Sequence, residues 1–359
     1  MSEDAEVLVR REGAWGLLTL NRPKALNALT ETMCRLISDA LLEWERDEGV
    51  EAVLIDHAGE RGFCAGGDIR LVRESGMGDG QAARAFFAAE YRMNELLFRY
   101  PKPTVVVMDG ITMGGGVGVS APCRYRVATE RTLWAMPEGD IGLYPDVGAG
   151  WHLARLPEGV GNWLALTGAR LRAADCVRLG IATHFLESER VEEVKAKLLS
   201  SRGDGLAEGL AEISGDPGQP PVEPHLPEIA RLFTAPTAEE VVGGLEGDAG
   251  EWARGQLEAV RRKCPMTVKV SLRLIEAGAR RASFADEMAA EYRASARMIH
   301  RHDFIEGVRA VLLDKDGSPR WDPASLEEVS EEMVEAVFAE LPTDEEWTPF
   351  PQEPAASAA

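Results

Sequence analysis

Two glycine-rich segments are the features of this sequence best suited to chemistry. One runs Gly62-Phe63-Cys64-Ala65-Gly66-Gly67-Asp68, and the other contains Gly114-Gly115-Gly116. Each follows a predicted strand and precedes a predicted helix, where free backbone amides and the helix dipole favour an anion. A thioester develops negative charge on its carbonyl oxygen during hydrolysis or enolisation, and one preorganised N–H donor stabilises that charge by about 3 kcal/mol. Two such loops could therefore serve one oxyanion, with an ordinary tight turn as the alternative for each loop.

Three acidic residues near these loops are candidates for acid–base work. Glu138 follows a proline at the end of a predicted strand, Asp146 lies in Pro145-Asp146-Val147-Gly148, and Glu90 lies within a helical pattern. A carboxylate in a closed, poorly solvated pocket can act as a base near neutral pH. The alternatives are a turn residue for Asp146 and a solvated charge for Glu90.

The elements that must position these residues alternate between strands and helices. Short apolar runs at 7–9, 17–20, 52–56, 104–108, 125–128 and 132–135 predict strands, while the spacing of apolar residues after Thr30 and across 82–99 predicts helices. This order indicates an α/β architecture. From about residue 187 the pattern changes to loop-rich segments, 200–221 and 243–250, and to helices around 266–277, 284–300 and 304–313. We therefore predict a catalytic core, 1–186, followed by a mainly helical C-terminal region, 187–359.

The net charge of −21 is concentrated in the second region and excludes nucleic acid and anionic membranes as expected partners. Residues 187–260 contain 16 acidic and 6 basic side chains, and residues 322–359 contain 11 acidic and none basic, which predicts an acidic insertion and an acidic tail.

No apolar run approaches the roughly 18 residues of a membrane span, and the N-terminus is acidic, so we expect a cytoplasmic protein. Five widely spaced cysteines and six histidines predict neither disulfides nor a metal site.

Three motifs in register resemble the crotonase (enoyl-CoA hydratase/isomerase) superfamily. They are Leu20-Asn21-Arg22-Pro23-Lys24-Ala25-Leu26-Asn27-Ala28-Leu29, Phe63-Cys64-Ala65-Gly66-Gly67-Asp68-Ile69 and Gly110-Ile111-Thr112-Met113-Gly114-Gly115-Gly116. The resemblance implies a spiral of repeated ββα units with a C-terminal helical region, often assembled as a trimer or a related homo-oligomer. It also implies oxyanion-hole amides at Gly67 and Gly115 and an acyl-CoA substrate. The positions that would line the CoA channel are Lys24, Ala25, Leu26, Ala65, Gly66, Asp68 and Ile69.

Segments further along the chain are similar to one branch of this superfamily, the 3-hydroxyisobutyryl-CoA hydrolases. These are 89–91, 135–148, 302–310 and 314–316 together with Trp321. The similarity implies that Glu138 is the general base or nucleophile, that Asp146 orients the substrate hydroxyl, the water or Glu138, and that Glu90 lines the acyl pocket. It further implies hydrolysis of a short 3-hydroxyacyl-CoA in valine breakdown, with no cofactor because CoA is part of the substrate.

One position departs from the hydratases of this superfamily. Hydratases use two glutamates. In this sequence Gly118 occupies the position of the first, and Glu138 occupies the position of the second. A hydrolase is therefore favoured, and an enoyl-CoA hydratase/isomerase is the alternative.

Candidates from other classes are weaker. Gly116-Val117-Gly118-Val119-Ser120-Ala121 has the spacing of a dinucleotide-binding loop, but Pro122 limits the following helix to about two turns. A non-catalytic scaffold is a further alternative. Cys64 is more consistent with a buried structural thiol than with a nucleophile, and no Gly-x-Ser-x-Gly elbow of a serine thioesterase is present.

Overall fold

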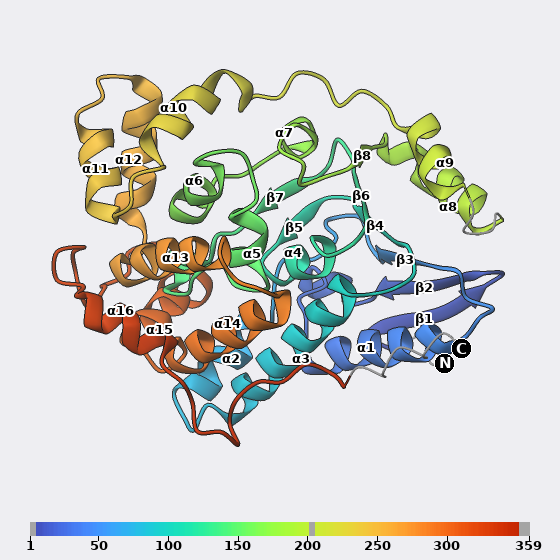
Figure 1. Cartoon of the computed structure of the whole chain (residues 1–359), viewed down its shortest axis with the longest axis horizontal. Coiled ribbons are helices and arrows are strands. Elements are labelled where there is room, and N and C mark those ends of the chain that lie inside the picture. Colours follow the sequence, from blue (N-terminus) through green and yellow to red (C-terminus); the bar gives the residue numbers. More distant parts are fainter. Residues whose placement is uncertain (1–4, 201–204, 352–359) are drawn as a thin grey trace.

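The computed structural model describes residues 5–200 and 205–351, and its centre is a mixed sheet covered by helices (Figure 1). The sheet has the order β1-β2-β3-β4-β6-β8, in which only β1 and β2 are antiparallel. A second, two-stranded sheet pairs β5 with β7 in parallel. The strands are β1 Val7–Glu12, β2 Trp15–Leu20, β3 Ala52–His57, β4 Thr104–Met108, β5 Ile111–Met113, β6 Tyr125–Ala128, β7 Leu133–Ala135 and β8 His184–Phe185.

Helices follow most strands of the first half of the chain. Thr30 begins α1 because its side chain accepts a hydrogen bond from the amide of Met33, as an N-cap threonine does. The buried side chains of β3 and β4 form an almost continuous apolar run, which is typical of parallel strands covered on both faces. The helices of this half are α1 Glu31–Arg46, α2 Ile69–Gly76, α3 Gln81–Phe98, α4 Gly115–Ser120, α5 Ala149–Leu153, α6 Val160–Thr167 and α7 Ala173–Arg178, with 3-10 turns η1 Pro23–Ala25 and η2 Glu138–Ile141.

The second half is helical from residue 188 onward. Its elements are η3 Ser188–Arg190, α8 Val191–Leu199, α9 Leu206–Ile213, η4 Glu223–His225, α10 Leu226–Leu232, α11 Ala238–Glu246, α12 Glu251–Arg262, α13 Pro265–Gly278, α14 Phe284–Met298, α15 His302–Val308, the π-helical turn η5 Arg309–Leu313 and α16 Glu331–Phe338. Helix α14 packs against α3, and α13 packs against α5 and α6. One hydrophobic core contains Leu18 and Val106 of the sheet together with Met288 and Phe304 of the C-terminal helices. The division at residue 186 stays a prediction.

The acidic tail is not a free appendage over its described part, 322–351. Glu345 pairs with Arg84 at 2.6 Å, and Glu346 pairs with Arg293 at 2.9 Å. Trp347 is 5% exposed and packs in the main core. The tail therefore returns along α3 and α14, as the red trace in Figure 1 shows.

Several expectations about individual elements need correction. The segment 200–221 contains the helix α9, and α11 extends through Gly243 to Glu246, so both predicted loop segments are partly helical. A helix expected over 304–313 is α15 followed by the π-helical turn η5. Helix α2 was not predicted, because its eight residues include only three large apolar side chains and give a weak periodic signal.

Candidate active site

A cavity of about 340 Å³ lies where the two glycine loops meet. Its wall combines the loop before α2, helix α3, the start of α4, the turn η2 and the π-helical turn η5. Eight of the predicted site residues line it: Ala65, Gly66, Gly67, Ile69, Glu90, Gly115, Glu138 and Asp146. The structure therefore brings together groups that are up to 81 positions apart in the chain.

The two glycine loops are in direct contact with each other. An added Cβ at Gly66 would lie 3.9 Å from the amide nitrogen of Gly115, and one at Gly115 would lie 3.3 Å from the carbonyl carbon of Gly66. Gly66 and Gly114 have φ values of +118° and +49°, which residues with a Cβ atom rarely adopt. In the described part of the chain, the amides of Gly67 and Gly115 donate no hydrogen bond, and Gly115 is the first residue of α4. Two free donors at one cavity wall suit an oxyanion.

Three carboxyl groups face this wall, and all of them are buried. Glu90, Glu138 and Asp146 are 2%, 6% and 5% exposed. Glu138 Oε1 lies 3.0 Å from the Cβ position of Gly114, and Glu90 Oε1 lies 2.5 Å from that of Gly115. Glu90 Oε1 and Glu138 Oε2 have no hydrogen-bond partner among the described residues. Buried, unpartnered carboxyl oxygens in a cavity are available to a substrate or to water.

The shared burial changes the acidity of these groups. Burial raises the pKa of Glu90 well above its usual range, and the charges of Asp146 and Glu138 raise it further. Burial and then the Asp146 charge raise the pKa of Glu138 in the same way. The pKa of Asp146 rises to about 6 by burial, against a hydrogen bond from Tyr91 that lowers it. Such shifts make the carboxylates stronger bases and mark the cavity as a candidate catalytic site.

The structure also explains why position 118 is a glycine. An added Cβ would lie 2.7 Å from Val147 Cβ and 2.9 Å from Asn94 Nδ2. Val147 belongs to the same loop as Asp146, so this loop occupies the space that a side chain at 118 needs. A glutamate at this position would displace the loop and Asp146 with it.

We expect Gly118→Ala to lower the free energy of unfolding by about 1–3 kcal/mol, because it overpacks a filled site. Gly243→Ala is the matched control, since Gly243 lies within α11 and has no atom within 4 Å of its Cβ position. That control should be neutral or stabilising by up to about 1 kcal/mol. Urea unfolding of both variants measures the difference, and equal stability would contradict the account of position 118.

The remaining predicted CoA-channel residues lie beside this cavity. Lys24 and Leu26 line a separate hollow of about 290 Å³ together with residues 58–62. Asp68 pairs with Arg22 at 3.3 Å, and Ala25 belongs to the turn η1. Neither Ala25 nor Asp68 lines either of the two hollows.

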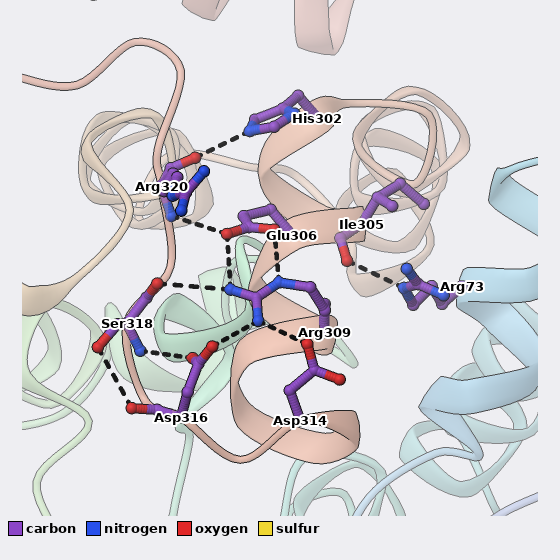
Figure 2. Close-up of polar contacts among 9 residues, drawn as sticks. All are labelled: Arg73, His302, Ile305, Glu306, Arg309, Asp314, Asp316, Ser318 and Arg320. Carbon is purple, nitrogen blue, oxygen red and sulfur yellow. Dashed lines mark hydrogen bonds and ion pairs between the residues drawn. The ribbon is translucent and has the colours of Figure 1, made fainter.

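The π-helical turn η5 closes the cavity with Val311 and Leu312. Figure 2 shows how Arg309 holds this turn: its guanidinium contacts Glu306 at 2.8 Å, Asp314 at 2.8 Å and Asp316 at 2.6 Å. Arg73 of α2 donates to the carbonyl oxygen of Ile305 at 2.9 Å. These contacts fix a short π-helical segment at the cavity, a kind of segment that is frequent at functional sites. The segments 302–310 and 314–316, for which the similarity was predicted, therefore flank the two residues of this turn that line the cavity.

A second group of polar residues near the cavity was not predicted from the sequence. Glu287, Glu291 and Ser295 lie on one face of α14, and each is 0% exposed. Their spacing of four residues, within a helix that is otherwise apolar on that face, is the signal that could have found them. Glu291 accepts hydrogen bonds from the amides of Gly148, at 2.8 Å, and Gly150, at 3.3 Å, just after Asp146.

Cys64 is fully buried, and burial raises its pKa to about 12, so its thiol stays protonated near neutral pH.

Within residues 5–200 and 205–351, no group of histidine, cysteine and acidic side chains could hold a metal ion. Across the same residues, no helix is long and apolar enough to cross a membrane.

The family model described as Enoyl-CoA hydratase/isomerase matches residues 15–338. The chain belongs to this family. Its relatives in the enoyl-CoA hydratase/isomerase family include proteins named "3-hydroxyisobutyryl-CoA hydrolase, mitochondrial". The one from Danio rerio is 44% identical over 94% of this chain and 90% of its own length. The one from Homo sapiens is 42% identical over 94% of this chain and 89% of its own length.

Solved structures of family members agree with the fold. A structure titled as a carnitinyl-CoA dehydratase from Mycobacterium thermoresistibile has a TM-score of 0.90 and 40% identity, covering 96% of this chain and 99% of its own. One titled as an enoyl-CoA hydratase from Rhodobacter sphaeroides has a TM-score of 0.88 and 38% identity, with the same coverage of both chains. The predicted crotonase-like α/β fold with its C-terminal helical region is confirmed.

Proposed function

We propose that this protein hydrolyses 3-hydroxyisobutyryl-CoA to 3-hydroxyisobutyrate and CoA, a step of valine catabolism. The observation that carries the proposal is that two free glycine amides and the buried carboxyl of Glu138 line the same cavity. In addition, position 118, where the hydratases have their first glutamate, has no space for a side chain. The long similarity to proteins named as 3-hydroxyisobutyryl-CoA hydrolases supports it.

The reaction needs little beyond these groups. The amides of Gly67 and Gly115 would bind the thioester oxygen as it becomes an oxyanion. Glu138 would either take a proton from the attacking water or attack the carbonyl carbon and form an anhydride that water then cleaves. In the first route Glu138 returns the proton to the departing CoA thiolate. In the second route water cleaves the anhydride at one of its two carbonyl carbons, so that its oxygen enters the product acid or Glu138, and its proton goes to the thiolate. Asp146 and Glu90 would contact the substrate hydroxyl and the acyl group.

The alternative, hydration of a 2-enoyl-CoA, is favoured by the titles of the two similar structures, which name a dehydratase and a hydratase. Hydration requires one group to activate water and a second to protonate the α-carbon. Gly118 leaves the second role unfilled, and Val147 and Asn94 leave no space to fill it by substitution.

The two functions predict different results with two substrates. Purified protein is incubated separately with 3-hydroxyisobutyryl-CoA, following free thiol, and with crotonyl-CoA, following enoyl absorbance. We expect rapid thiol release from the first and no comparable loss of absorbance from the second. Rapid loss of enoyl absorbance without thiol release would identify a hydratase and overturn the proposal.

Three further properties belong to the proposal. We propose that the reaction uses no cofactor, which exhaustive dialysis against a chelator without loss of activity would test. A cytoplasmic location stays a prediction, to be tested by cell fractionation, because the similar vertebrate proteins carry the word mitochondrial in their names. A homo-oligomer, trimeric or related, also stays a prediction and is tested by light scattering.

A further inference from the structure

A chain of hydroxyl groups connects Asp146 with helix α14. Tyr91 Oη donates to Asp146 Oδ2 at 2.7 Å and lies 2.7 Å from Ser295 Oγ. Ser295 Oγ lies 2.8 Å from Tyr144 Oη, which donates to the carbonyl oxygen of Glu291 at 2.6 Å. Tyr91, Tyr144 and Ser295 are each 0% exposed. The chain therefore runs from the cavity wall to the C-terminal helical region without contact with solvent.

The direction of the hydrogen bonds among these hydroxyl groups indicates a role for Ser295. Tyr91 and Tyr144 each have one hydroxyl hydrogen, and each donates it outward, to Asp146 and to the Glu291 carbonyl. The single hydrogen of Ser295 Oγ can therefore be donated to only one phenolic oxygen at a time, that of Tyr91 or that of Tyr144. Ser295 can thus donate to Tyr91 while Tyr91 donates to Asp146, which links helix α14 to the Asp146 carboxyl.

The same helix fixes the backbone beside Asp146. Val147 and Gly148 have φ values of +55° and +89°, so the loop adopts a conformation that is unfavourable for Val147. The Glu291 carboxyl accepts the amides of Gly148 and Gly150 immediately afterwards. Buried polar networks of this kind make a single side-chain arrangement the stable one when their groups are satisfied.

We propose that Tyr91 and Ser295 are positioning residues for hydrolysis, which hold the Asp146 carboxyl through Oδ2 so that its other oxygen faces the substrate. This inference rests on the proposed function and makes helix α14 part of the catalytic arrangement. Neither residue lines the cavity, so they act through Asp146 rather than on the substrate.

The hydrogen bond from Tyr91 also favours the ionised form of Asp146, the form that accepts a hydrogen bond from a substrate hydroxyl or water. The other titratable groups around Asp146 are Glu90 from α3, Glu138 from η2, Tyr144 from the preceding loop and Glu291 from α14. The pKa of Asp146 is raised to about 6 by burial and lowered by Tyr91. Removal of the Tyr91 hydroxyl should therefore raise the pKa of Asp146 further. When the pH is lowered, the variant should then lose activity at a higher pH than the wild-type protein does.

The test compares Tyr91→Phe, Ser295→Ala and the double variant in the thiol-release assay. For Tyr91→Phe we expect kcat to fall by about 10-fold or more, as for the loss of a hydrogen bond to a charged group, with KM within about threefold of wild type. The acid limb of its pH profile should move upward by about half a pH unit or more. Ser295→Ala should give a smaller loss in kcat, and the double variant should be no more than about twofold slower than Tyr91→Phe, because both act through one chain.

Matched controls are Tyr292→Phe on the same helix, whose hydroxyl has no hydrogen bond among the described residues, and Ser38→Ala, a buried serine whose Oγ is unpartnered. Both should retain wild-type kcat and pH profile. Unchanged kcat in Tyr91→Phe, an unmoved acid limb, or additive losses in the double variant would each overturn the inference while leaving the proposed function intact. Absence of thiol release by the wild-type protein would overturn both.

Discussion

Glu138→Gln should reduce the release of CoA by at least about 100-fold while binding of the acyl-CoA persists. Glutamine keeps the shape of the side chain but can neither take a proton from water nor attack the thioester. Because Glu138 is 6% exposed and its Oε2 has no hydrogen-bond partner in the described structure, the substitution should disturb few existing contacts. Thiol release measures turnover, and calorimetric titration with a non-hydrolysable thioether analogue measures binding.

Glu158→Gln is the control for this experiment, because Glu158 is an exposed glutamate outside the cavity. It should retain wild-type turnover. If Glu138→Gln kept more than about a tenth of wild-type turnover, neither proton transfer nor covalent attack by this residue could supply its usual rate factor. A single turnover in ¹⁸O-labelled water then separates the two routes, because only the anhydride route can place label in the Glu138 carboxyl group.

Gly115→Pro should reduce turnover by at least about 100-fold more than Gly115→Ala does. Both substitutions add a Cβ 2.5 Å from Glu90 Oε1 and 2.9 Å from Leu29 Cδ1, so both shift these side chains. Only proline also removes the amide hydrogen, and proline suits the first position of a helix, where Gly115 lies. Proline also places a ring carbon where the amide hydrogen was, so the ratio of the two variants reports the loss of a usable donor site at this nitrogen.

Circular dichroism and thermal unfolding must show that both Gly115 variants are folded. Equal turnover of folded Gly115→Ala and Gly115→Pro would show that this amide does not stabilise the oxyanion. A large loss in both variants would instead assign the effect to displacement of Glu90.

The sequence alone determined the features that depend on local chemistry and regular spacing. Thr30 and the apolar residues after it predicted α1, and the apolar run at 52–56 predicted β3, because a cap and a periodic pattern act within a few residues. The two glycine loops were identifiable because their backbone conformations, such as φ of +118° at Gly66, favour glycine. The similarity of motifs then predicted the family and eight of the residues that line the cavity.

Only the tertiary structure decided which distant groups meet. It brought the Gly66 and Gly115 loops into contact, buried three carboxyls together, and placed Val147 and Asn94 in the space beside Gly118. It also connected Asp146 with Ser295, 149 positions later, through Tyr91. Burial and pKa depend on every element that packs around a group, and those contacts are formed by residues far apart in the chain, so no local pattern contains them.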